Sequence, residues 1–188
     1  MGSNKALLDF GGRPLIRVLI DKISPLTKHV VISSNDPASY RFLNFPVVPD
    51  LFQGCGPLAG FHAAMRHQPY ALYLMLACDL PNLQERLLRS LVALVDGFDA
   101  AIPLTTDGLA HPLCAVYRRT CLQSVEQALQ RGSKKVIEIF LDNTLKLRWV
   151  HPDEGHFRDD DLANINTPED LERLRSGPPL ESAKKLYM

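Results

Sequence analysis

Hydrophobic positions along the chain fall into two alternating patterns. Apolar residues recur at every third or fourth position in PLIRVLIDKI (14–23), which predicts a helix. A short β-branched run, HVVISS (29–34), ends at turn residues 35–37 and predicts a buried strand. FPVVPD (45–50) predicts a second brief strand. Regular structure in this part of the chain therefore follows the order helix, strand, strand.

The alternation continues toward the C-terminus. PLAGFHAAMRHQ (57–68) has helical spacing, and YALYLMLACD (70–79) is an almost continuous apolar run that ends in an acid. A run that is apolar on both faces is typical of the centre of a parallel sheet. The remaining patterns predict helices at 83–95, 120–130 and 134–141 and strands at 99–103, 111–117 and 145–150.

The last regular segment is TPEDLERLR (167–175). Thr167 suits the N-cap of a helix, Pro168 its first position and Glu169 its positive first turn, so this pattern predicts a helix start. Residues 176–188 contain two prolines and few apolar side chains, which indicates a flexible tail. We therefore expect one domain at 1–175, followed by the tail.

Strands that alternate with helices imply right-handed crossovers. The expected class is α/β, with a mostly parallel sheet covered by helices on both faces. Ligands of such sheets bind beyond the carboxyl ends of the strands. Residues that follow the predicted strands are therefore the candidates for chemistry.

Composition narrows the class of protein. The 21 lysines and arginines balance the 21 aspartates and glutamates, so no net charge favours nonspecific binding of nucleic acid or of an anionic membrane. The four cysteines are far apart, lack C-x-x-C spacing and indicate reduced structural thiols. No apolar run approaches the roughly 18 residues of a membrane helix, and the N-terminus has no signal pattern. We expect a cytoplasmic protein with no nucleic-acid or membrane partner.

Two acids follow predicted strands. Asp79 ends the longest apolar run, where a carboxylate can bind a hard cation such as magnesium. Its alternative role is to cap the helix that begins near Leu83. Asp50 precedes the glycine-rich stretch 54–60, in which the backbone can approach a ligand closely. The alternative for this stretch is an ordinary strand-to-helix turn.

Five polar residues complete the candidate set. Lys5 lies in MGSNK, which reads like the end of a phosphate-binding turn, although an isolated lysine is usually solvated. Asn35 ends a strand, where its amide can read a base edge or form a turn. His111 opens a strand and faces a ligand, the packed interior or solvent. Asn164 and Asn166 lie two apart, so in an extended segment both amides face one side and either bind a ligand or fix the loop.

Several catalytic motifs are absent from the sequence. It contains no G-x-S-x-G elbow, no H-E-x-x-H, no Walker G-x-x-x-x-G-K-[ST] and no complete G-x-G-x-x-G. The sequence therefore gives no motif in favour of a hydrolase, a zinc protease or an ordinary NAD-dependent enzyme.

A family resemblance rests on seven stretches taken in order: MGSNKALLDFGGRPLI, VVISSN, VVPD, GPLAG, CDLP, HPLCAVYRR and NINTPEDL. Together they resemble the molybdenum cofactor guanylyltransferases, the molybdopterin-guanine dinucleotide biosynthesis protein A (MobA) family, from Met1 to about Leu174. The resemblance implies a Rossmann-like, three-layer nucleotidyltransferase fold. It also implies transfer of GMP from GTP to the terminal phosphate of molybdopterin carrying molybdenum, with release of pyrophosphate and a requirement for Mg²⁺.

The resemblance also implies roles for individual residues. The family's phosphate-contacting lysine falls on Lys5, its guanine-side asparagine on Asn35, its nucleotide-contacting aspartate on Asp50 and its magnesium aspartate on Asp79. GPLAG, here Gly56, Pro57, Leu58, Ala59 and Gly60, would border the guanine, and Asn164 and Asn166 would lie toward the pterin. Catalysis of this kind is mainly positioning and electrostatic stabilisation, carried here by Lys5 and Asp79, with the acceptor phosphate as nucleophile. Transient contacts with other proteins of cofactor biosynthesis and with molybdoenzymes are expected.

The N-terminus departs from the family pattern. Family members begin with an apolar strand and a glycine-rich turn of the form L-A-G-G-x-S-x-R before the M-G-x-x-K that stands here at 1–5. Met1 therefore resembles an internal methionine, and we expect that the sequence was started late or truncated. Loss of that first strand is expected to leave unpaired strand edges, and loss of the turn is expected to weaken GTP binding.

Two alternatives stay open from the sequence. The first is another nucleotidyltransferase of the same architecture, either the cytidylyl enzyme of the same cofactor pathway or a sugar-phosphate nucleotidyltransferase. GPLAG and NINTPEDL argue against it. The second is a noncatalytic remnant that keeps the fold and acts as a binding partner in cofactor assembly.

Overall fold

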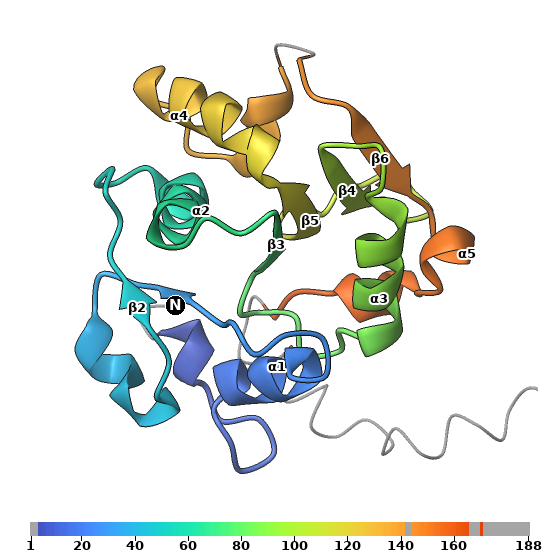
Figure 1. Ribbon diagram of the computed structural model, residues 1–188. Coiled ribbons are helices and arrows are strands. Elements are labelled where there is room, and N and C mark those ends of the chain that lie inside the picture. Colours follow the sequence, from blue (N-terminus) through green and yellow to red (C-terminus); the bar gives the residue numbers. More distant parts are fainter. Residues whose placement is uncertain (1–3, 142–143, 166–169, 171–188) are drawn as a thin grey trace, which may run out of the picture.

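A computed structural model describes residues 4–141, 144–165 and 170 (Figure 1). The α-helices are α1 (Leu15–Ile23), α2 (Gly56–His67), α3 (Glu85–Leu94), α4 (Leu122–Gln130) and α5 (Pro152–Gly155). The strands are β1 (Ile32–Ser33), β2 (Val47–Val48), β3 (Leu72–Leu76), β4 (Ala100–Pro103), β5 (Cys114–Arg118) and β6 (Leu147–Val150). The 3-10 helices are η1 (Lys5–Leu7), η2 (Pro37–Leu43), η3 (Arg119–Cys121), η4 (Val136–Phe140) and η5 (Asp159–Leu162).

The strands form two sheets. The larger one has the order β3-β5-β4-β6, and β1 and β2 form a parallel pair of their own. β4 is parallel to β6 but antiparallel to β5, which is also antiparallel to β3. Strands β3, β4 and β6 therefore run in one direction, and their carboxyl ends lie at the same edge. The expected α/β class is confirmed. Strand β5 differs from the other three strands of this sheet because it runs in the opposite direction.

The direction of β5 follows from its connection. A parallel neighbour of β4 would need a crossover of a dozen or more residues, which usually includes a helix. Residues 104–113 instead return directly beside β4, with backbone pairing between Leu104 and Ala110. This short return makes β5 antiparallel to β4.

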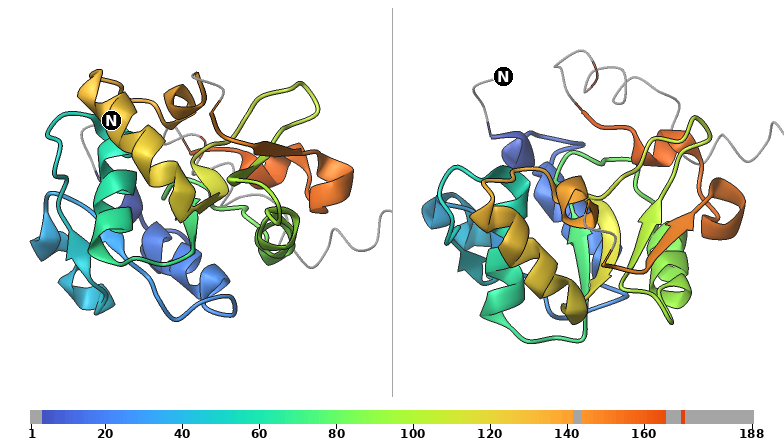
Figure 2. Two further views of the ribbon diagram at one scale, coloured as in Figure 1. Left: turned by 45° about the horizontal axis from the view of Figure 1, so that its top comes forward. Right: turned by 90° about the horizontal axis from the view of Figure 1, so that it is seen from above.

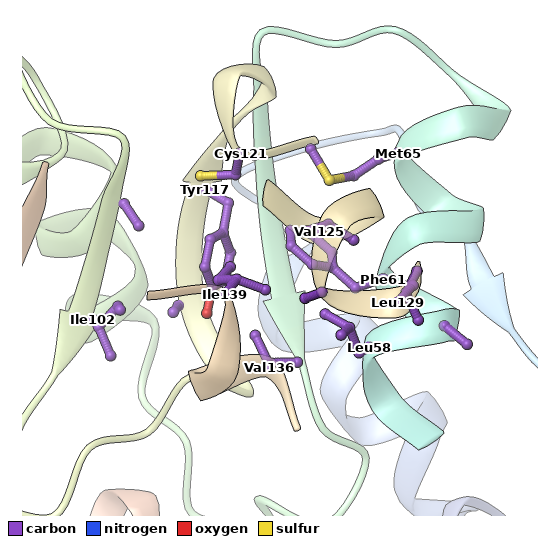
Figure 3. Packing of buried hydrophobic residues seen from close by; sticks show 14 residues of the cluster. Leu58, Phe61, Met65, Ile102, Tyr117, Cys121, Val125, Leu129, Val136 and Ile139 are labelled. Carbon is purple, nitrogen blue, oxygen red and sulfur yellow. The ribbon is translucent and has the colours of Figure 1, made fainter. Parts of the chain in front are cut away.

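Helices cover both faces of the larger sheet, as Figure 2 shows for α2 and α4 on one side and α3 on the other. Alternate strand residues enter different cores because successive side chains point to opposite faces. Ile102 and Tyr117 pack with α2 and α4, whereas Ala101 and Val116 pack against the leucines of α3. Figure 3 shows the first cluster, in which Phe61 and Tyr117 have ring centroids 4.7 Å apart. The molecule is therefore a three-layer α/β structure.

Helix α3 shows how the sequence pattern produces these layers. Its buried residues Leu87, Leu88 and Leu91 recur at helical spacing and are each 0% exposed. Burying one such side chain stabilises the fold by about 1.5–3 kcal/mol. The opposite face carries Arg89, which pairs with Glu85 four residues earlier.

Several sequence expectations change in detail. The 134–141 segment is the short 3-10 helix η4 rather than an α-helix. Strand β3, expected at the centre of a sheet, pairs only with β5 among the described residues, and β1 pairs there only with β2. Each therefore has one edge without a partner strand in the part of the chain that is described. The predicted helix at 167–175 and the tail at 176–188 lie outside the described residues, apart from residue 170.

Four short elements were not predicted: η1, η2, α5 and η5. These elements have between three and seven residues, too few for a hydrophobic period to repeat clearly. None of the helices in the described part of the chain is both long enough and apolar enough to cross a bilayer.

Candidate functional site

Lys5 and Asp79 meet just beyond the end of β3. The ammonium Nζ of Lys5 lies 3.7 Å from Oδ2 of Asp79 and donates a hydrogen bond of 3.0 Å to the backbone oxygen of Ile165. The Ile165 amide in turn donates to the backbone oxygen of Asp79 at 2.9 Å. Three distant parts of the chain are thus joined around one carboxylate.

The second oxygen of Asp79 has an unusual environment. Oδ1 is buried and has no hydrogen-bond partner among the described residues, although the side chain as a whole is 18% exposed. A buried carboxylate oxygen without a partner is costly, so it favours a bound cation. No group of three or more His, Cys, Asp or Glu residues in the described chain is arranged to hold a metal. The arrangement fits Mg²⁺, which binds through one or two acids together with phosphate oxygens and water.

Asn35 and Asp50 form a second polar pair, at the ends of β1 and β2. Asn35 Nδ2 donates to Asp50 Oδ2 at 3.0 Å, and the Asp50 amide donates to Asn35 Oδ1 at 2.9 Å. Ser33 Oγ donates to the other carboxylate oxygen of Asp50 at 3.3 Å. Because β1 and β2 are parallel, their carboxyl ends lie together and bring these three residues into contact.

The GPLAG segment forms the beginning of α2 and packs directly on this second pair. A Cβ atom on Gly60 would lie within 2.4 Å of Ser33 Oγ and 3.6 Å from Asp50 Oδ1, so only glycine fits without a shift. Gly56 has a φ of +59°, a backbone conformation that also favours glycine. The cap residue Cys55 makes no side-chain hydrogen bond to the helix, and among the first residues of α2 the exposed Gly56 carries an amide that a ligand can reach.

The five GPLAG residues divide between two environments. Gly56 and Pro57 are exposed, whereas Leu58 and Ala59 are 0% exposed and belong to the core shared with α4. The side chains of Leu58 and Ala59 therefore hold the helix in place, and a ligand can reach only exposed parts of the segment. Gly60 is buried against Ser33.

The remaining candidates lie farther along the same edge. Asn164 is exposed and directly precedes Ile165, whose backbone contacts Asp79, and Asn166 lies outside the described residues. His111 donates its backbone amide to Pro103 at the end of β4, apart from both polar pairs. The structure thus gathers Lys5 with Asp79 and Asn35 with Asp50.

Two contributors were missed by the sequence analysis. Ser33 lies in the SSN stretch two residues before Asn35, so its place at the end of a predicted strand could have identified it as a candidate. The backbone of Ile165 has no signal in the sequence, because a carbonyl oxygen is common to every residue. Cys78, next to Asp79, is a free thiol whose pKa is raised by burial and then by the neighbouring carboxylate, which makes it a poor nucleophile.

Comparisons with known proteins give a consistent result. The family described as MobA-like NTP transferase domain matches residues 1–146. A protein of Pelotomaculum thermopropionicum named probable molybdenum cofactor guanylyltransferase is 34% identical over 93% of this chain and 85% of its own length. The molybdenum cofactor guanylyltransferase of Desulfosudis oleivorans is 32% identical over 93% of this chain and 87% of its own length.

Solved structures share the architecture. Molybdopterin-guanine dinucleotide biosynthesis protein A from Archaeoglobus fulgidus superposes with a TM-score of 0.76 at 27% identity, over 98% of this chain and 93% of that one. The 2-C-methyl-D-erythritol 4-phosphate cytidylyltransferase from Thermus thermophilus superposes with a TM-score of 0.68 at 14% identity, over 89% of this chain and 90% of that one. The latter similarity is one of fold.

Proposed function

The chain belongs to the MobA-like NTP transferase domain family, and we propose that it transfers GMP from GTP to molybdopterin carrying molybdenum. The product is molybdopterin guanine dinucleotide, and pyrophosphate is released. Membership of the family makes the chain a nucleotidyltransferase; the choice of GTP and molybdopterin is the proposal. It rests on the names of relatives that are 34% and 32% identical to this chain. We expect the reaction to take place in the cytoplasm.

One observation carries the proposal: the cation–carboxylate pair of Lys5 and Asp79 at the carboxyl edge of the sheet. Nucleotidyl transfer develops negative charge on the α-phosphate and on the leaving pyrophosphate. The Lys5 ammonium, 32% exposed and 3.7 Å from a carboxylate, can contact such oxygens. Charges held in advance lower the barrier because they need little rearrangement during the reaction.

Bond changes in the proposed reaction need no protein nucleophile. An oxygen of the acceptor's terminal phosphate attacks the α-phosphorus of GTP and forms the new phosphoanhydride bond. The bond between the α-phosphorus and the oxygen that bridges to the β-phosphorus breaks, and its electron pair leaves with pyrophosphate. Lys5 stabilises the phosphate oxygens as their charge grows.

Asp79 is the residue that would hold Mg²⁺, through the buried oxygen that has no partner in the described chain. When bound, the cation would neutralise phosphate charge. Asn35, Asp50 and the start of α2 would take the guanosine end of GTP. The remaining hydrogen and lone pair of the Asn35 amide, together with the amide of the exposed Gly56, supply hydrogen bonds suited to a base.

Thermal unfolding with added nucleotides tests the proposal. We expect GTP with Mg²⁺ to raise the melting temperature of the 188-residue chain. A hundredfold excess over Kd stabilises the native state by about 2.7 kcal/mol. CTP should give a much smaller rise. Asp79→Ala should lose the effect of GTP, whereas Asp96→Ala, which removes a carboxylate that is 97% exposed, should keep it.

Product formation completes the test. With molybdopterin present, the wild-type chain should release pyrophosphate from GTP, and Asp79→Ala should not. A shift that favours CTP, or a GTP shift that persists in Asp79→Ala, would contradict the proposed site.

A further inference from the structure

His111 lies at the same edge of the sheet as Asp79. It begins a turn that ends at Cys114, since the Cys114 amide donates to the His111 oxygen at 2.9 Å. On one side of this turn, His111 donates its amide to Pro103 at the end of β4, at 3.0 Å. On the other side, Ala77 just beyond β3 donates to Leu113 at 2.7 Å. The turn therefore bridges the carboxyl ends of β3 and β4.

Two carboxylates form an acidic rim beside His111. Asp159, at the start of η5, accepts hydrogen bonds from the backbone amide of Thr106 at 3.1 Å and from its hydroxyl. Asp107 accepts from the hydroxyl of Thr105 and from the backbone amide of Leu109 at 3.3 Å. Figure 2 shows the loop that carries these threonines beside the segment of η5. These hydrogen bonds hold both carboxylates in position, and each carboxylate can still accept further hydrogen bonds.

One ring nitrogen of His111 lacks a hydrogen-bond partner among the described residues. This atom, Nε2, is buried, although the residue as a whole is partly exposed. Burial lowers the pKa of His111, and the nearby charges of Asp107 and Asp159 offset this only in part. The ring is therefore neutral at pH 7, with one nitrogen that donates and one that accepts. A buried polar atom without a partner gains free energy when a ligand supplies one.

One segment of the chain links the acidic rim to the Lys5–Asp79 pair. Helix η5 contains Asp159 and leads directly into residues 163–165. The last of these, Ile165, is bonded to both Asp79 and Lys5. A molecule whose phosphate lies at Lys5 can therefore extend along this segment toward His111.

We propose that His111, with the rim of Asp107 and Asp159, binds the nitrogen heterocycle of the acceptor substrate while the acceptor's phosphate lies at Lys5. This inference rests on the proposed function. The two carboxylates repel phosphate. Carboxylates and the acceptor nitrogen of a neutral imidazole accept hydrogen bonds from N–H groups, such as those of a 2-amino-4-oxo pterin ring. The charges at the edge thus orient the acceptor: its heterocycle faces the acids and its phosphate faces the lysine.

Steady-state kinetics with molybdopterin as acceptor and saturating GTP test this assignment. His111→Leu should raise the acceptor KM about tenfold. The substitution removes one hydrogen bond to the heterocycle and leaves the polar group of the heterocycle without its partner. The kcat and the stabilisation by GTP should change little. His111→Gln should recover most of the affinity, because its amide can donate and accept. His29→Leu is the matched control and should leave KM unchanged, because the His29 ring lies 5.0 Å from that of Tyr70, just before the amino end of β3.

A second measurement uses the wild-type chain and does not depend on a folded variant. In a spectrum of ¹⁵N-labelled histidine, molybdopterin should shift the His111 ring signals, and GTP alone should not. An unchanged acceptor KM in a folded His111→Leu variant, or an unmoved His111 signal at saturating acceptor, would overturn the assignment. Failure of the proposed function is a separate result: GTP would then not stabilise the wild-type chain, while the histidine spectrum would still report whether the acceptor binds here.

Discussion

Asn35 and Asp50 hold each other in place through two hydrogen bonds of opposite direction, 3.0 Å from the Asn35 amide nitrogen to the Asp50 carboxylate and 2.9 Å from the Asp50 backbone amide to the Asn35 oxygen. This exchange fixes which end of the asparagine amide faces which way. One hydrogen and one lone pair of the Asn35 amide remain for a ligand. The pair therefore prepares a donor and an acceptor at the ends of two strands.

Asn35→Asp should turn this contact from attractive to repulsive. The new carboxylate would face Asp50 Oδ2 across the present 3.0 Å hydrogen bond, so we expect a loss of about 1 kcal/mol in unfolding free energy and weaker GTP binding. Urea unfolding at neutral pH and nucleotide titration measure the two effects. The swapped variant, Asn35→Asp with Asp50→Asn, restores an amide–carboxylate pair and should recover stability. If the single variant is as stable as wild type, the pair is not structural.

Lys5→Met should reduce transfer far more than it reduces folding stability. Methionine keeps the apolar stem but removes the charge from the phosphate site, and we expect transfer to fall by about 10²–10³-fold. Pyrophosphate release at saturating substrates gives this rate.

Lys22→Met is the control for that variant. Lys22 Nζ also donates to a backbone oxygen close to Asp79 in sequence, that of Pro81 at 2.5 Å, but no ion pair with Asp79 is formed by Lys22 within the described part of the chain. It should lose some stability and keep most of its activity. Equal losses of activity in the two variants would argue against a specific role for the Lys5 charge.

Gly60→Ala should disturb the second polar pair through a steric clash. The added methyl group would lie 2.4 Å from Ser33 Oγ and 3.1 Å from Ser33 Cβ, so α2 or β1 must shift. We expect destabilisation of about 1–3 kcal/mol by overpacking, measured by urea unfolding. Adding Ser33→Gly removes both clashing atoms and should restore part of the loss. A fully stable Gly60→Ala variant would mean that the helix is not held tightly on the strand.

Element types followed well from hydrophobic periodicity, and element ends did not. The predicted helix at 14–23 is α1, Leu15–Ile23, but the strand predicted at 29–34 pairs only over Ile32–Ser33. The reason lies in its partner, since prolines at 46 and 49 flank Val47–Val48 and contribute no amide hydrogen to extend the ladder. Periodicity describes which faces are buried, not how far a neighbour can pair.

Candidate site residues followed from their places at strand ends, and their partners did not. Asn35, Asp50 and Asp79 were all selected by that rule, yet contact between Asn35 and Asp50 depends on β1 lying beside β2. The bond from Lys5 to the oxygen of Ile165 joins two segments 160 residues apart, and one end of it is a backbone atom. Strand order and backbone contacts of this kind are properties of the assembled fold.

The contact between Lys5 and Ile165 also sets an order of events during synthesis of the protein. A ribosome delivers Lys5 among the first of the described residues and Ile165 near the end of them, 160 positions later. Asp79 and the strands β3 to β6 are all synthesised in between. The hydrogen bond from Lys5 to Ile165 can form only after residue 165 has left the ribosome. A chain that ends before residue 165 would therefore contain every described strand and still lack this contact.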